Sequence, residues 1–167
     1  MLTMAGLRPP LPDATSDGFL AEALAEANAH RAKHHAPPLV LDPELVEYAR
    51  SRAASRSEYP DTQAGHDGLR EGTGENLFWG AGSKKRPLAA GKAVAEWYDE
   101  IKGYDFGNPE NVADCGHFTQ LVWKGSRRMG AGRVAGQGPV FFETYIIFVF
   151  EEPGNKLGRF AENVRPA

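Results

Sequence analysis

Hydrophobic residues recur at helical spacing in three stretches of the first two thirds of the chain. The stretch from residue 17 is amphipathic until Pro37, and a proline cannot continue a helix. Asp42 is expected to cap a second helix that runs through PELVEYARSRAASR, with a proline at its first position. Residues 88–104 repeat the helical pattern. The pattern therefore predicts three helices before residue 105.

The pattern then changes to short runs of apolar and β-branched residues that are typical of strands. We expect strands over HFTQLVW (117–123), RMGAGRVA (128–135) and VFFETYIIFVFEE (140–152). Short glycine-rich links between them favour antiparallel pairing. Residues 145–150 are apolar on both faces, so helices should cover both sides of the sheet. The order of elements predicts an α+β domain with a small, mainly antiparallel central sheet.

The chain divides into a short lead and one domain. Residues 1–17 are rich in Pro, Gly, Ser and Asp and are expected to form a flexible N-terminal lead. Residues 18–167 contain no further linker, internal repeat or low-complexity segment. A chain of 167 residues suits a single domain with its own core.

Composition excludes several classes of protein. The 19 basic and 22 acidic residues give a net charge of −3, which argues against an electrostatic grip on nucleic acid. No apolar run is long enough to span a membrane, and the first residues lack the features of a signal peptide. A single cysteine cannot form an internal disulfide. If the chain is complete, these features favour an intracellular or peripheral location.

Polar residues near Cys115 raise the first chemical question. In the expected strand, alternation places His117 on one face together with Trp123. Cys115 would share that face only if the strand extended back through Gly116. A Cys/His nucleophile pair requires the sulfur within hydrogen-bond reach of the imidazole. We favour the alternative, a packed cysteine with no catalytic role.

Two glutamates lie beside apolar residues. Glu100 falls on the shoulder of the apolar stripe of the third helix, beside Trp97, whereas Glu96 points further into solvent. Glu100 is either a cleft carboxylate with a tuned pKa or a boundary residue that solvates the helix. Glu75, in GENLFWG, is expected to be a partly buried loop carboxylate. A cap or a backbone-bonding role is the alternative for Glu75.

The histidines give weaker signals. His66 lies in a polar, glycine-rich loop and by itself predicts only an exposed side chain. His30 and His34 are four residues apart, a spacing that could chelate a metal ion. Both lie on the apolar side of the first helix near its C-terminal end, so we expect a structural role. The chain contains no phosphate-binding Walker motif, HExxH, CxxC or GxSxG motif.

Several motifs, in order, resemble one known family. GHFTQLVWKGS resembles the signature of the CAP superfamily, which comprises cysteine-rich secretory proteins, antigen 5 and pathogenesis-related proteins and is also called the SCP domain. GENLFW, IIFVFEEPGN and the first two helices are similar to further family motifs. WYDEIKGYDF and FAENVRP resemble the Golgi-associated plant pathogenesis-related branch. The resemblance covers about residues 18–165.

The resemblance implies a three-layer α–β–α sandwich with an open cleft that holds two histidines and two glutamates. By motif these are His117, Glu75 and Glu100, and His66 is the only histidine in the loop before GENL. Imidazole nitrogens and carboxylate oxygens that converge in a cleft are ligands suited to Zn²⁺ or another divalent metal. No organic cofactor is expected.

The family is associated with binding rather than with catalysis. The resemblance implies a non-enzymatic module with a metal-capable cleft and a surface or groove for a lipid, a sterol, a small apolar ligand or a protein partner. Homo-oligomers and peripheral membrane contact are further implications. One alternative is a metal-dependent hydrolase that uses the same four residues, with Glu75 or Glu100 in the catalytic role. The other alternative is an interaction protein that works as a homo-oligomer.

Aromatic residues could supply the lipid-binding surface or could form ordinary core. The candidates are Phe78, Trp79, Trp97, Trp123 and the run at 145–150.

This chain departs from the family pattern at several positions. The family is mostly extracellular and its extracellular branches carry several disulfides, whereas this chain has one cysteine. Leu2 stands where N-myristoylation requires a glycine. His35 follows the first helix where relatives often have glycine, so a strained or different cap is expected. The loop at 80–91 is longer than in the Golgi-associated branch, which predicts a remodelled cleft rim.

Overall fold

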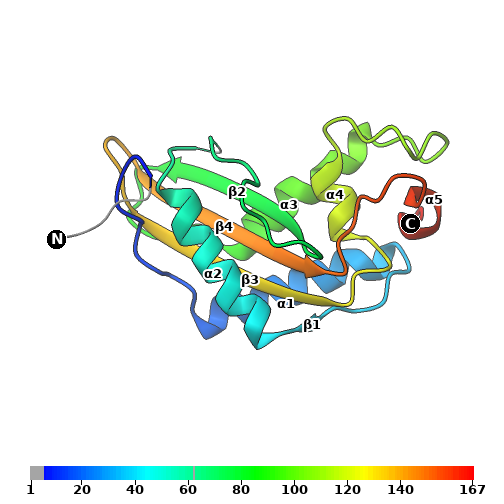
Figure 1. The fold of residues 1–167 in the computed structure, drawn as a ribbon, viewed down its shortest axis with the longest axis horizontal. Coiled ribbons are helices and arrows are strands. Elements are labelled where there is room, and N and C mark those ends of the chain that lie inside the picture. Colours follow the sequence, from blue (N-terminus) through cyan, green and yellow to red (C-terminus); the bar gives the residue numbers. More distant parts are fainter. Residues whose placement is uncertain (1–5, 62) are drawn as a thin grey trace.

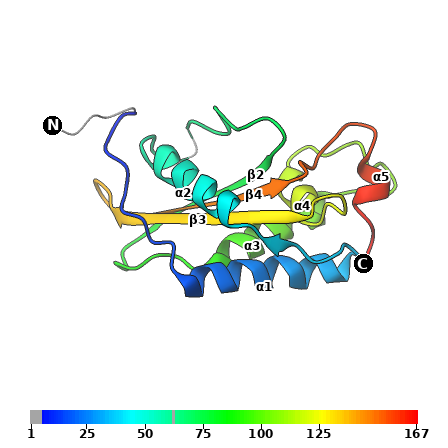
Figure 2. The same cartoon turned by 60° about the horizontal axis from the view of Figure 1, so that its bottom comes forward.

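A central sheet lies between two layers of helices in the computed structural model, which describes residues 6–61 and 63–167. In chain order the elements are α1 (Asp17–Lys33), β1 (Val40–Leu41), α2 (Pro43–Ser57), β2 (Gly74–Gly82), α3 (Ala90–Asp99), the 3₁₀ helix η1 (Glu100–Gly103), α4 (Gly116–Leu121), β3 (Arg128–Gln137), β4 (Phe142–Glu151) and α5 (Phe160–Asn163). Helix α2 covers one face of the sheet, and α1 and α3 cover the other (Figures 1 and 2). The predicted α–β–α sandwich is confirmed.

The sheet has the strand order β1-β3-β4-β2. Strands β2, β4 and β3 pair antiparallel, and the two-residue β1 adds a parallel pair at the β3 edge. Strand β3 lies directly under α2, where a Cβ on Gly130 would come within 2.1 Å of the Leu45 backbone. The glycines of β3 therefore allow the close approach of α2 to the sheet.

The helix boundaries follow local capping chemistry. Ser16 caps α1 by accepting a hydrogen bond from the Phe19 amide at 3.1 Å. Asp42 caps α2 as predicted, since its side chain accepts from the first-turn amides. The third helix is shorter than expected, because α3 ends at Asp99 and the chain continues as the 3₁₀ turn η1 from Glu100.

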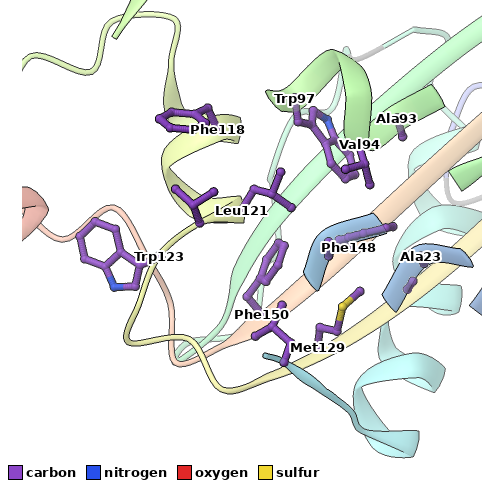
Figure 3. Close-up of a cluster of buried hydrophobic side chains, with 14 of the residues drawn as sticks. Ala23, Ala93, Val94, Trp97, Phe118, Leu121, Trp123, Met129, Phe148 and Phe150 are labelled. Carbon is purple, nitrogen blue, oxygen red and sulfur yellow. The ribbon is translucent and has the colours of Figure 1, made fainter. Parts of the chain in front are cut away.

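Two buried clusters form the core, one on each face of the sheet. The larger cluster packs α1, α3 and α4 against the sheet and includes Trp97, Phe148 and Phe150 (Figure 3). The smaller cluster lies under α2 and includes Tyr145 and Leu45. The aromatic residues that were candidates for a lipid surface lie mostly inside these clusters: Phe78, Trp97, Trp123 and residues 145–150 are buried, and Trp79 is half-buried. For these buried residues the core interpretation is correct.

The sequence pattern was wrong about two elements near the site. HFTQLVW, which alternation predicted as a strand, begins as the short helix α4. Phe118, Leu121 and Val122 are all fully buried, at the i, i+3 and i+4 spacing of one helical face. Over such a short apolar run, strand and helix periods cannot be distinguished. Glu75 lies within strand β2, not in a loop.

The N-terminal segment contacts the sheet and α2. Arg8 pairs with Glu143 at 2.6 Å, and Asp13 forms an isolated bridge with Val134. The first five residues of the predicted lead, including Leu2, lie outside the described residues, and the division of the chain after residue 17 stays a prediction. Within the described residues, no helix has both the length and the apolar character to cross a membrane.

Candidate functional site

One cleft brings together the four residues that the family resemblance implied. Its volume is about 340 Å³, and it is lined by His66, Glu75, Asn76, Glu100, Asp114, Gly116, His117 and Asn155. His66 comes from the loop that follows α2, Glu75 from β2, Glu100 from η1 and His117 from α4. Four separate segments of the chain therefore build one site.

His66 is held by a buried carboxylate. Its Nδ1 lies 2.8 Å from Glu75 Oε1. The Glu75 side chain is fully buried, and Arg52 donates to both of its oxygens, at 2.6 and 2.8 Å. This carboxylate thus links α2, β2 and the loop that carries His66.

The ionisation of Glu75 follows from these partners. Burial alone would raise the pKa of the Glu75 carboxyl, because a charged group loses its water. The hydrogen bonds from His66 and Arg52, together with their positive charge, outweigh burial and hold that pKa below its ordinary value. Glu75 is therefore an ionised acceptor at neutral pH, so the facing Nδ1 of His66 donates.

His117 has a matching partner in Glu100. Its Nδ1 lies 2.8 Å from Glu100 Oε2. The other oxygen, Oε1, accepts hydrogen bonds from the backbone amides of His117 at 2.9 Å and Phe118 at 3.1 Å. These amides belong to the first turn of α4, where N–H groups lack a partner within the helix. Glu100 therefore caps α4 and orients its histidine at the same time.

In both histidine–glutamate pairs the same ring atom, Nε2, is left without a hydrogen-bond partner among the described residues. With Nδ1 engaged in each ring, Nε2 of His66 and Nε2 of His117 have no hydrogen-bond partner among the described residues. The His117 ring also stacks on Trp97, with ring centroids 6.2 Å apart and planes inclined by 21°. A histidine whose Nδ1 donates to a carboxylate has the arrangement found in metal-binding histidines.

The contacts of Glu75 and Glu100 differ from those expected if all four residues were metal ligands. Among the residues that the structure describes, no group of three or more His, Cys, Asp or Glu side chains is placed to hold a metal ion. Glu75 and Glu100 instead contact the histidines and their own protein donors. The prediction that all four residues bind a metal directly stays untested, and the geometry assigns the glutamates an orienting position.

Sequence reasoning missed the two arginines behind His66. Arg52 donates to the Asp67 carbonyl at 2.6 Å, and Arg56 donates to the same carbonyl at 2.6 Å and to that of Gly65 at 3.3 Å. Both side chains are buried and fix the loop on either side of His66. Their spacing of four residues on the buried face of α2 was the available signal.

Other candidate residues have packing roles. Cys115 is buried, and burial raises the pKa of its thiol, which disfavours a nucleophilic thiolate. His34 is buried, with Nδ1 at 2.7 Å from the Arg165 carbonyl oxygen and Nε2 at 2.8 Å from the Tyr98 hydroxyl. His30 stacks on the same tyrosine ring. The structure places neither histidine in the cleft.

Comparison with known proteins agrees with the sequence motifs. The CAP family, described as the cysteine-rich secretory protein family, matches residues 24–150. The chain is 33% identical over 160 residues to human Golgi-associated plant pathogenesis-related protein 1, a match that covers 90% of this chain and 95% of that protein.

Two solved structures share the fold. BmVAL-1 has a TM-score of 0.69 at 17% identity, and the match covers 100% of this chain and 88% of the BmVAL-1 chain. NaASP2, crystallised with Zn²⁺, has a TM-score of 0.64 at 20% identity, with 93% of this chain and 91% of that chain covered. The extent of the family match and the identity to the human relative show that the chain belongs to the CAP family, the cysteine-rich secretory proteins.

Proposed function

We propose that this CAP-domain protein is a non-enzymatic binding module whose cleft takes up a divalent metal ion, zinc in the first place, through Nε2 of His66 and Nε2 of His117. One observation carries the proposal. Each imidazole has its Nδ1 at 2.8 Å from a glutamate oxygen, which fixes the ring and leaves Nε2 as the free donor atom.

The donor set suits zinc and leaves the metal open to a further ligand. Imidazole nitrogen is a preferred zinc donor, and zinc sites usually have four ligands. Two protein nitrogens would leave coordination positions for water or for a polar group of a bound molecule. When bound, the ion would supply a Lewis-acidic centre in the cleft. The structural neighbour crystallised with Zn²⁺ supports the choice of metal.

The contacts of the two glutamates favour binding over hydrolysis. A hydrolase would need one carboxylate as a base within reach of a water molecule. Both oxygens of Glu75 already accept from Arg52 and His66, and its lowered pKa makes it a weak base. Both oxygens of Glu100 are engaged by His117 and the first turn of α4. Catalysis by this site would require one of these networks to open.

The test is a zinc titration by calorimetry. The parent chain is compared with His66→Ala and His117→Ala, and His35→Asn serves as the matched control because His35 is an exposed histidine outside the cleft. We expect both cleft variants to lose about tenfold or more in affinity and the control to bind like the parent. Absence of zinc binding by the parent, or equal binding by all four proteins, would refute the metal site.

A conservative change in Glu100 tests whether this carboxylate supports metal binding by His117. Glu100→Gln keeps the side-chain shape but replaces one acceptor oxygen with an amide. If Glu100 orients His117, the Glu100→Gln variant should bind zinc about 10- to 100-fold more weakly than the parent. Unchanged affinity in this variant, with the fold intact, would show that the carboxylate does not support the histidine.

Lipid or sterol binding, homo-oligomerisation and peripheral membrane contact remain proposals that follow from family membership. Any such surface must be formed by other residues, because Phe78, Trp97 and Trp123 are buried.

A further inference from the structure

The turn between β3 and β4 carries exposed apolar side chains. Strand β3 ends at Gln137 and β4 begins at Phe142, so the turn consists of Gly-Pro-Val-Phe at residues 138–141. Within this turn Val140 is 74% exposed and Phe141 is 51% exposed. Glycine, proline and small polar residues are usual in turns, so the turn itself does not require either apolar side chain. Neighbouring exposed apolar side chains, unlike isolated ones, mark an interaction surface.

The N-terminal segment brings a third exposed apolar side chain to this end of the molecule. Arg8 donates to both oxygens of Glu143, at 2.6 and 3.2 Å, and Glu143 is the second residue of β4. The preceding Leu7 is 65% exposed. The turn and the start of the described chain lie at the end of the sandwich that is opposite to α5 (Figures 1 and 2). Leu7, Val140 and Phe141 make up the apolar tip of the molecule.

A basic cavity lies beside the turn. Its volume is about 550 Å³, and its lining includes the cationic Lys84, Arg86 and Lys92 and the apolar Leu88 and Phe142. Phe142 directly follows the exposed Phe141 in the chain and pairs with Gly82, the last residue of β2. The loop that carries Lys84 and Arg86 begins immediately after Gly82. The cavity and the apolar tip are therefore neighbours.

The basic cavity carries a local positive charge, whereas the chain as a whole has a net charge of −3. Lys84, Lys85 and Arg86 are exposed and have no ion pair among the residues described. Lys92 lies 3.6 Å from the exposed Glu96. None of the described residues that line the cavity is acidic. This end of the molecule is therefore complementary to a surface that carries negative charge.

We infer that the β3–β4 turn docks the protein on an anionic lipid bilayer, with Val140 and Phe141 inserted into the bilayer and the basic cavity beside them in contact with lipid phosphate groups. A peripheral element binds a membrane through its buried apolar area together with electrostatic attraction to anionic lipids. The turn supplies the apolar area, and Lys84, Lys85 and Arg86 supply the charge. This inference assigns a surface to the peripheral membrane contact proposed above, and it does not depend on bound metal.

The arrangement favours a bilayer over a protein partner. A stable protein interface takes about 800 Å² of surface from each partner, which a single projecting turn does not offer. A turn can instead enter a bilayer, because lipids close around it on all sides. The long stems of lysine and arginine allow their charges to stay at the level of the headgroups while the apolar side chains lie deeper.

Co-sedimentation with lipid vesicles tests the inference. The full chain is mixed with vesicles of phosphatidylcholine alone, or of phosphatidylcholine with an equal share of phosphatidylserine, and a metal chelator is present throughout. We expect binding to the mixed vesicles to be at least about tenfold stronger than binding to the neutral ones. Added salt should release the protein from the mixed vesicles, because salt screens the attraction between exposed charges.

Two variants test the apolar tip. Phe141→Ser should weaken binding to the mixed vesicles by about tenfold, because a large apolar side chain is lost from the inserted area. Leu157→Ser is the matched control, since Leu157 is 84% exposed and lies in the segment before α5, at the opposite end of the molecule. Phe141→Ser should bind zinc as the parent does, so failure of the metal site and failure of this surface are separate results.

Charge reversal tests the basic cavity. Lys84→Glu combined with Arg86→Glu should weaken binding to the mixed vesicles by about tenfold or more. Lys124→Glu combined with Lys156→Glu makes the same change of charge at exposed positions outside the cavity and should have no such effect. Circular dichroism checks that every variant keeps the fold.

Three results would overturn the inference. They are absence of binding by the parent to the mixed vesicles, equal binding by the parent to neutral and mixed vesicles, and undiminished binding by Phe141→Ser or by the variant with Lys84 and Arg86 reversed. Sedimentation of the parent without vesicles as a homodimer that Phe141→Ser converts to monomer would also contradict it, because the tip would then belong to an interface between two copies of the chain.

Discussion

The two histidine–glutamate pairs of the cleft have similar distances but different surroundings. Glu75 has no exposed side-chain surface and pairs with a buried arginine, whereas the Glu100 side chain is 23% exposed and bonds to backbone amides. The Arg52–Glu75 pair is therefore the more consequential for stability, because a buried charge that loses its partner is costly.

Glu75→Gln tests this charge pair through its pH dependence. The folded-state pKa of Glu75 is lowered below its ordinary value of 4.5, so the carboxylate stabilises the fold above that pH, and this stabilisation is lost as pH falls through the folded-state pKa. We expect the variant to be about 3 kcal/mol less stable than the parent at neutral pH. The difference should shrink in acid. Urea unfolding from pH 7 to pH 3 measures this difference, and a difference that stays constant would show that the charge of Glu75 does not stabilise the fold.

Sequence motifs identified three of the cleft residues, and His66 followed only as the one histidine in the loop before GENL. None of these signals identified the partners of the four residues. The motif around GENL pointed to Glu75, whereas Arg52 lies 23 residues earlier and is linked to Glu75 only by the packing of α2 on the sheet. Local periodicity marks the face of a helix that is buried. It does not say which buried polar groups meet across the core.

At the scale of elements, capping signals were more informative than the alternation of apolar residues. Asp42 and the proline after it marked the start of α2 correctly. The strand expected at HFTQLVW was wrong, because the short α4 depends on Glu100 from η1 to cap its first turn. That support comes from a residue 17 positions away and is invisible to a local pattern.

The end of α1 confirms the strained cap expected at His35. Its φ is 61°, in the left-handed region, and Ala36 N donates to Arg31 O at 3.0 Å in the manner of a Schellman motif. We expect His35→Gly to stabilise the fold by about 0.5 to 1 kcal/mol, since glycine adopts this conformation without strain but loses more entropy on folding. Chemical denaturation measures the gain. An equal gain for His35→Ala would show that strain at φ is not the cause.

The contact of α2 with β3 makes a second prediction at this scale. A Cβ on Gly130 would lie 2.1 Å from the backbone of Leu45, so Gly130→Ala must push α2 away from the sheet. We expect a loss of about 1 to 3 kcal/mol in the free energy of unfolding. Gly82→Ala is the control, because a Cβ there meets nothing within 4 Å. Similar losses for both variants would refute this explanation.

At the scale of the whole molecule, the layered fold was predictable and the assembly of the cleft was not. The apolar run at 145–150 implied a sheet covered on both faces, and β4 lies at its centre. The cleft instead depends on the return of the loop after α2 to β2, which the buried Arg52 and Arg56 fix through backbone carbonyls. Family motifs supplied what pattern alone could not.

Metal binding by both histidines requires that two separate segments present equivalent imidazole nitrogens to one ion. Nitrogen-15 NMR of the histidine rings during a titration with zinc can observe this atom by atom. We expect the neutral rings of His66 and His117 to carry their proton on Nδ1 and zinc to shift both Nε2 resonances. His34, with both nitrogens engaged by protein, should not respond. Protons on Nε2 in the cleft histidines, or a zinc response confined to one ring, would contradict metal binding by both histidines.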